Sequence, residues 1–134
     1  MVLSRVSYEL FAHEADLVVS QIHSDAVQLD RQLRLDLEDG ACVYVSWAWG
    51  PGGGDYHVAH ELSSFCSEPP EVVLDASASP IWSPLINRDI EVAYHRSDKQ
   101  VLAVRSETAA VYCCSFESGR WGMDSLLVCS TLPD

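Results

Sequence analysis

The residues best suited to chemistry are Asp55, His57, His60 and Glu61, which form the pattern D-x-H-x-x-H-E. Imidazole and carboxylate groups are common zinc ligands and general acids or bases. In the zinc hydrolase motif H-E-x-x-H, the two histidines lie four positions apart on one helix face and the glutamate is the base. Here the histidines are three apart, and on a strand they would face opposite sides. We therefore predict no metal site and no cofactor, and keep His57, His60 and Glu61 as weak metal candidates.

Aromatic residues flank the glycine-rich segment that precedes this cluster. Trp47 and Trp49 end a predicted strand, the sequence GPGGGD fills positions 50–55, and Tyr56 follows. The segment lacks the Lys-Ser/Thr of a phosphate loop, but aromatic side chains line small-molecule pockets and anchor protein interfaces. We expect Trp47 in the core and Trp49 exposed. The candidate binding residues are Trp47, Trp49, Gly52, Gly53, Gly54, Tyr56, His57 and His60.

No catalytic residue is assigned, because the chain has no G-x-S-x-G nucleophile elbow and scattered serines, cysteines and histidines mean little by themselves. The enzyme alternative is a small metal-assisted or acid–base hydrolase that uses the 55–61 cluster. It requires the side chains of His57, His60 and Glu61 to converge on one substrate.

The charge balance excludes several partners. The chain has 20 acidic residues against 8 Lys and Arg, a formal net charge of −12. Proteins that bind nucleic acids or anionic membranes need clustered basic residues, and here the basic residues are scattered. We interpret the excess of acidic residues as a solvated surface; the alternative is attraction for a basic protein or a cationic small molecule. The chain lacks the apolar run of roughly 18 residues typical of a membrane span, and acidic residues interrupt its N-terminal stretch, so we expect a cytoplasmic protein.

Five cysteines, an odd number without C-x-x-C spacing, do not suggest a disulfide framework. Four of them, at 42, 113, 114 and 129, fall in predicted strands, where a free cysteine acts as a small buried hydrophobic residue. Cys113 and Cys114 are adjacent and should point to opposite faces of their strand. They are therefore poorly placed to share one tetrahedral metal ion.

The strand that positions the candidate site is predicted at 41–49, paired with a strand at 32–38. A two-residue turn at Asp39-Gly40 would set charged residues beside the apolar face of 41–49. A three-residue loop, 38–40 with Gly40 at positive φ, instead pairs Leu35 with Val43 and Leu33 with Val45. We predict the three-residue loop.

The remaining pattern predicts a helix from about residue 4 to Glu14, with Ser7 as N-cap, and a strand from about Leu17. Residues 79–87 allow at most one helical turn, and Trp82 and Trp121 should plug the ends of the core. The further predicted strands are 56–62, 71–75, 89–96, 101–106, 110–117 and 125–131.

A faint repeat is visible when the chain is shifted by 73 positions, which places Asp16, Val19, Ser24 and Asp25 on Asp89, Val92, Ser97 and Asp98. It suggests two related halves. The predicted fold is a single, mainly antiparallel β domain spanning 1–134, a sandwich or partly open barrel of about seven to nine strands with one short N-terminal helix.

The leading hypothesis for function is a non-catalytic binding or interaction protein. Its partner would be a small molecule, a basic protein, as for an immunity-type protein that neutralises a toxin, or a second copy bound through an edge strand. The aromatic-flanked glycine segment and the acidic composition favour this hypothesis over the hydrolase alternative.

Overall fold

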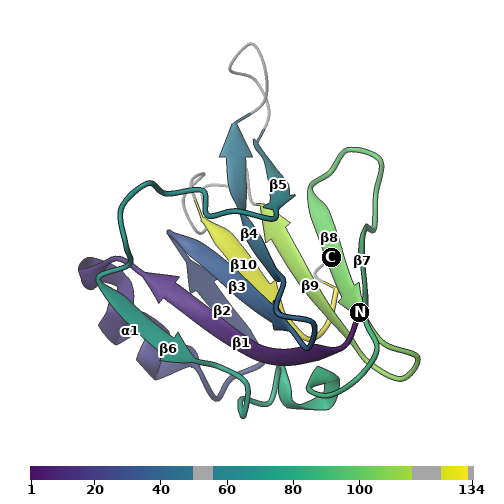
Figure 1. Ribbon diagram of the computed structural model, residues 1–134. Coiled ribbons are helices and arrows are strands. Elements are labelled where there is room, and N and C mark those ends of the chain that lie inside the picture. The colour runs from purple at the N-terminus through teal and green to yellow at the C-terminus, as the bar shows by residue number, and fades with distance from the viewer. Residues whose placement is uncertain (50–55, 116–124, 133–134) are drawn as a thin grey trace.

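The computed structural model describes residues 1–49, 56–115 and 125–132, and its strands form two antiparallel sheets (Figure 1). This confirms the predicted mainly antiparallel β fold. The described residues contain ten strands, one more than the upper end of the expected range. The first sheet has the order β5-β4-β3-β1-β6 and the second β2-β10-β9-β8-β7. The strands are β1 (Leu3–Leu10), β2 (Ala26–Leu29), β3 (Gln32–Leu37), β4 (Cys42–Trp49), β5 (Tyr56–Glu61), β6 (Val72–Asp75), β7 (Glu91–Tyr94), β8 (Val101–Arg105), β9 (Ala110–Ser115) and β10 (Leu126–Cys129).

The β3–β4 hairpin has the predicted register. Leu35 lies opposite Val43 and Leu33 lies opposite Val45. Gly40 has φ of 90°, and its N–H donates to the carbonyl of Leu37 at 3.0 Å. The three-residue loop is therefore confirmed, and it places the leucines and valines of both strands on the face that is buried.

The N-terminal prediction is wrong. Residues 3–10 form strand β1, which pairs with both β3 and β6, and the helix comes later as α1 (Ala15–Gln21), where a strand was expected. A 3-10 turn, η1 (Ala12–Glu14), joins them. The buried Glu14 carboxylate fixes this junction, because it accepts hydrogen bonds from Phe11 N at 2.9 Å and Asp30 N at 2.7 Å. Contacts distant in sequence thus override the local helical pattern.

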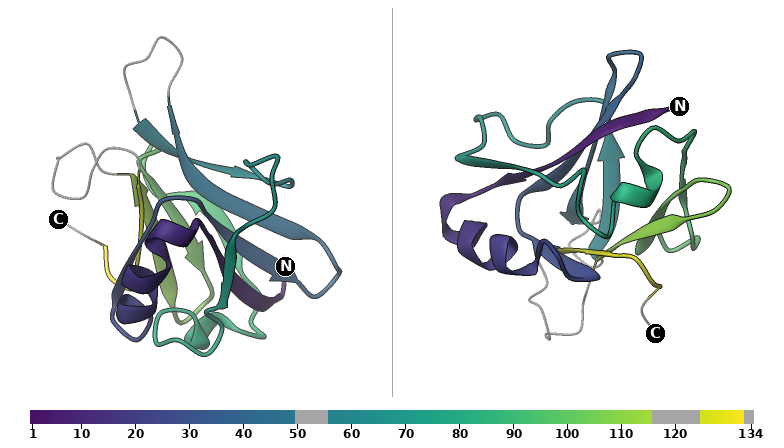
Figure 2. Two further views of the ribbon diagram at one scale, coloured as in Figure 1. Left: turned by 90° about the vertical axis from the view of Figure 1, so that its left-hand side faces the viewer. Right: turned by 90° about the horizontal axis from the view of Figure 1, so that it is seen from below.

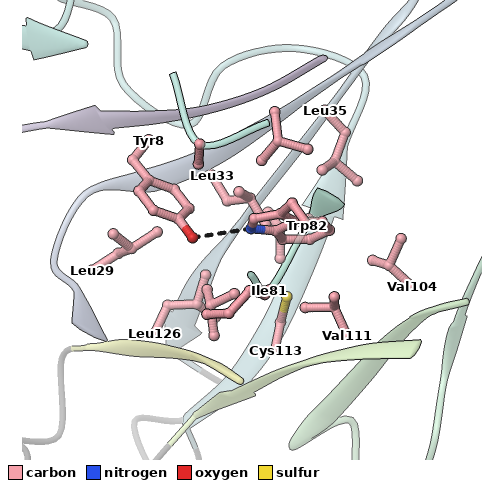
Figure 3. Packing of buried hydrophobic residues seen from close by; sticks show 14 of the residues in the cluster. Tyr8, Leu29, Leu33, Leu35, Ile81, Trp82, Val104, Val111, Cys113 and Leu126 are labelled. Carbon is pink, nitrogen blue, oxygen red and sulfur yellow. Dashed lines mark hydrogen bonds between the residues drawn. The ribbon is translucent and has the colours of Figure 1, made fainter. Parts of the chain in front are cut away.

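One core cluster contains side chains of both sheets. The chain between β6 and β7 enters it, with the 3-10 turn η2 (Ser83–Leu85) as its one helical turn, as predicted. Trp82 and Ile81 lie between Tyr8 and Leu33 of the first sheet and Val111 of the second (Figure 3). Trp82 is therefore fully buried between the two sheets, where a plug at the end of the core was expected, and Trp121 lies outside the described residues.

The two sheets form the layers of a sandwich and are joined along β5 (Figure 2). Val58 N donates to the carbonyl of Lys99 at 2.8 Å, and the hydroxyl of Tyr94 donates to the carbonyl of Val58 at 2.9 Å. The strand β5 of the first sheet is thereby tied to the β7–β8 hairpin of the second.

The faint repeat does not match equivalent elements at its beginning. Val19 lies in helix α1, whereas Val92 lies in strand β7. Further along, Val43 and Val111 both lie in strands. Within the described ranges, no helix is long and apolar enough to cross a membrane.

Candidate functional site

The histidines of the 55–61 cluster lie on opposite faces of β5. His60 pairs with Val45, which faces the core, and His57 pairs with Ala48, whose side chain points to the outer face of the sheet. Glu61 comes four residues after His57, which is about 13 Å along a strand. Asp55 lies outside the described residues. In the ranges that the structure describes, no group of three His, Cys, Asp or Glu side chains is arranged to hold a metal ion.

The aromatic part of the predicted site is described only at Trp47. Its side chain is half-buried instead of fully in the core, and its Nε1 donates to the carbonyl of Asp30 at 2.9 Å. The hydrogen bond ties β4 to the corner between β2 and β3. For Trp49 and Tyr56 only the backbone pairing is described, and Gly52, Gly53 and Gly54 lie outside the described residues.

His60 lines a hollow between the two sheets, which we call the His60 pocket. It has a volume of about 310 Å³ and is lined by Met1, Val43, His60, Glu61, Leu62 and Val92. These residues come mainly from the end of β4–β5 in the first sheet and from β7 in the second. Val43 is almost fully buried and Val92 half-buried, so the hollow has an apolar floor, while His60, Glu61 and Leu62 are exposed at its rim.

The His60 ring is held against the second sheet. It meets the Tyr94 ring edge-on, with centroids 5.5 Å apart and an interplanar angle of 61°. Burial raises the pKa of Tyr94, and the Glu61 carboxylate raises it further. The Tyr94 hydroxyl already donates to the Val58 carbonyl, so it stays protonated as a structural donor. The arrangement offers an imidazole and a carboxylate beside an apolar surface.

A second hollow adjoins the His60 pocket and shares Met1 and Val92 with it. It has a volume of about 530 Å³, and its charged lining residues are Asp89, Glu91, Glu107 and Arg105. Acidic groups therefore outnumber basic ones around this second hollow. The whole sequence has the same excess of acidic residues.

A buried polar cluster on the outer face of the first sheet was missed by the sequence reasoning. Glu9 accepts hydrogen bonds from Arg31 NH1 at 3.3 Å and from Gln32 Nε2 at 2.6 Å, and all three residues are buried. The chain between β5 and β6 covers them, since Arg31 NH2 also donates to the carbonyl of Glu68 at 2.8 Å. From the sequence alone, charged residues in β1 and at the β2–β3 corner are expected to be exposed, because nothing indicates that the chain between β5 and β6 covers them.

The cysteines predicted in strands lie there. Cys113, Cys114 and Cys129 are buried, and Cys42 is half-buried. The Cys42 thiol donates to Asp36 Oδ1 at 3.1 Å, and its pKa is raised by burial and by that carboxylate. Cys42 is therefore a weak nucleophile. In comparisons with known proteins, no family model, curated protein or solved structure matches the chain, so its function has to be inferred from the geometry of its own sites.

Proposed function

We propose that this chain is a non-catalytic binding protein that holds a small molecule, with an apolar body and a positive charge, in the His60 pocket. The observation that carries the proposal is an apolar hollow between the sheets with a carboxylate, Glu61, at its rim. Ligand sites typically combine a mainly apolar lining with a few polar groups that orient the ligand.

The size of the pocket limits the ligand. A volume of about 310 Å³ lies at the lower end of the range for small-molecule sites, roughly 300–1,000 Å³. A single ring with a short chain, or a branched alkyl group, would fill it. Val43 and Val92 would contact the apolar body, and Leu62, which is 78% exposed, would gain contacts that it lacks in the empty pocket.

The charge of the ligand follows from the lining. Glu61 is the one carboxylate in the His60 pocket, and no lysine or arginine lines it among the described residues. The Met1 ammonium is already paired with Asp89 at 2.6 Å, and Lys99 lies against the Tyr94 ring, with its Nζ 5.7 Å from the ring centroid. A net charge of −12 adds a general attraction for cations. A ligand ammonium group would pair with Glu61 and approach the rings of His60 and Tyr94.

The placement of the histidines supports binding over hydrolysis. His57 and His60 face opposite sides of β5, so one bound substrate could not use both. The Tyr94 hydroxyl is occupied by the Val58 carbonyl. His60 would therefore orient a ligand through contact with its polar group, with Glu61 as the charged partner.

Calorimetry with phenethylamine, phenethyl alcohol and phenylpropionate tests the proposal, because the three probes share a ring and chain but differ in charge. We expect affinity to fall in that order. Glu61→Gln should weaken the amine by up to about fivefold, as expected for an exposed ion pair, and leave the alcohol unchanged. Val92→Trp should fill the hollow and weaken all three probes.

Asp16→Asn is the matched control, since it removes an exposed carboxylate from helix α1, outside the pocket. It should leave the affinity for the amine unchanged. Equal affinity for the three probes, or amine binding that survives Val92→Trp, would overturn the small-molecule proposal. The charge would then favour a basic protein as the partner.

A further inference from the structure

Two cysteine side chains meet on the outer face of the second sheet. Cys114 of β9 and Cys129 of β10 are both buried in a small cluster with Val101 and Leu127, separate from the main core. Their thiols are neighbours that influence each other electrostatically, and the Cys129 thiol donates to the carbonyl oxygen of Tyr112 at 3.5 Å. The neighbouring Cys113 points the other way, into the core (Figure 3).

The register places the two cysteines diagonally. Cys114 is directly opposite Leu127, and Cys129 is directly opposite Tyr112. Diagonal neighbours have α carbons about 7–8 Å apart, whereas a disulfide usually needs roughly 4.4–6.8 Å. The two side chains are thus neighbours in one cluster, but a diagonal spacing is too wide for an unstrained sulfur–sulfur bond.

A bridging atom suits this spacing better. Metal–sulfur bonds of about 2.3 Å on each side separate two sulfurs by about 4.6 Å when the arrangement is linear. Small rotations of the two side chains would reach that separation without moving the strands. Which metal ion fits then depends on how many protein ligands the site offers.

We propose that Cys114 and Cys129 form a two-thiolate site for one soft monovalent metal ion, of the copper(I) and silver(I) class. Soft thiolates favour such ions. In the described part of the chain, no third His, Cys, Asp or Glu side chain completes a cluster with the pair. Zinc, which prefers four ligands, is therefore disfavoured. On binding, each thiol releases its proton to solvent, and the site keeps a single negative charge.

The two thiols differ in how readily they lose a proton. Hydrogen bonding to the Cys114 thiol lowers the pKa of Cys129, against the effects of burial and of the Asp25 carboxylate. Cys129 is thus the first of the pair to ionise. The interaction with Cys129 and burial raise the pKa of Cys114 by more than the Arg96 guanidinium lowers it, so Cys114 keeps its proton until the metal ion displaces it. The exposed His95 contacts the Tyr112 ring beside the pair.

Silver(I) titration of the fully reduced protein, in an excess of glutathione and without oxygen, tests the site. Glutathione competes with single thiols, whereas a chelating pair has a high effective concentration and should retain one ion per chain in native mass spectrometry. Cys114→Ser and Cys129→Ala should each weaken retention by at least about a hundredfold. Circular dichroism would establish that each variant is folded.

Cys66→Ser is the matched control, because Cys66 is a half-buried free thiol outside this cluster. It should retain silver like the unmodified chain. Retention by folded Cys114→Ser, or equal retention of zinc(II), would overturn the proposal. Rapid formation of a Cys114–Cys129 disulfide with diamide would also contradict it, because the sulfurs would then reach bonding distance without a bridging ion.

Discussion

The indole Nε1 of Trp82 donates a hydrogen bond of 3.0 Å to the hydroxyl of Tyr8, and both side chains are fully buried. Figure 3 shows this pair among aliphatic side chains of the two sheets. The hydrogen bond gives both the indole N–H and the tyrosine hydroxyl a partner, which the surrounding aliphatic side chains cannot provide. Burial raises the pKa of Tyr8 more than the Trp82 hydrogen bond lowers it, so the tyrosine remains neutral in the folded chain.

Tyr8→Phe should lower the free energy of unfolding by about 1–3 kcal/mol near neutral pH, because it leaves the Trp82 N–H buried without a partner. The folded-state pKa of Tyr8 is raised, so its contribution is complete below the unfolded pKa of about 10 and declines at higher pH. The difference in the free energy of unfolding between the unmodified chain and Tyr8→Phe, measured by urea unfolding, should therefore become smaller above about pH 10. Tyr44→Phe, at a half-exposed position, should show a smaller loss. A difference in the free energy of unfolding that does not change with pH would contradict this account.

Gly40→Val should destabilise the β3–β4 hairpin by about 1–2 kcal/mol, measured by thermal or urea unfolding, because a β-branched residue is strained at positive φ. A Cβ at this position would meet nothing within 4 Å, so the cost is conformational and not steric. Gly40→Asn is the control and should cost less, since asparagine tolerates the left-handed region. Equal losses in the two variants would show that backbone conformation is not the cause.

Arg31→Met should lower the free energy of unfolding by at most about 3–5 kcal/mol, because it removes the closest cationic partner of the buried Glu9 carboxylate and leaves only the partly exposed Arg34, whose NH1 lies 3.6 Å from Glu9 Oε2. Adding Glu9→Gln should recover part of the loss by removing the charge. The exposed pair Arg5–Asp75, at 3.5 Å, provides the comparison, and Arg5→Met should cost less than about 1 kcal/mol. If the double variant is no more stable than Arg31→Met, the weaker pairing of the Glu9 charge is not what destabilises the single variant.

The sequence predicts those parts of the fold whose signals are local. In the β3–β4 hairpin, alternating residues in both strands and a glycine between them suffice to determine the register. Residues 3–15 are different, because Val6, Tyr8 and Leu10 alternate as in a strand while Tyr8, Phe11 and Ala12 have helical spacing. Pairing of β1 with two neighbouring strands resolves the conflict in favour of the strand.

The candidate site was predictable only in part. His60 was recognised by residue type, but Val92 comes from the second sheet and has no feature that marks it as a pocket residue. The contact between β5 and the β7–β8 hairpin brings them together, through the backbone of Val58 and Lys99. Similarly, nothing in the sequence around Cys114 and Cys129 indicates that their strands are adjacent.

The pairing of β2 with β10 has a consequence for how the chain is made. Ala26 pairs with Cys129, and most of the chain lies between them. On the ribosome, β2 therefore emerges long before the strand that holds it in the second sheet, and among the described strands it pairs with none of the first sheet. Such distant pairing is expected to slow folding. The nascent chain should become resistant to protease only after β10 has left the exit tunnel.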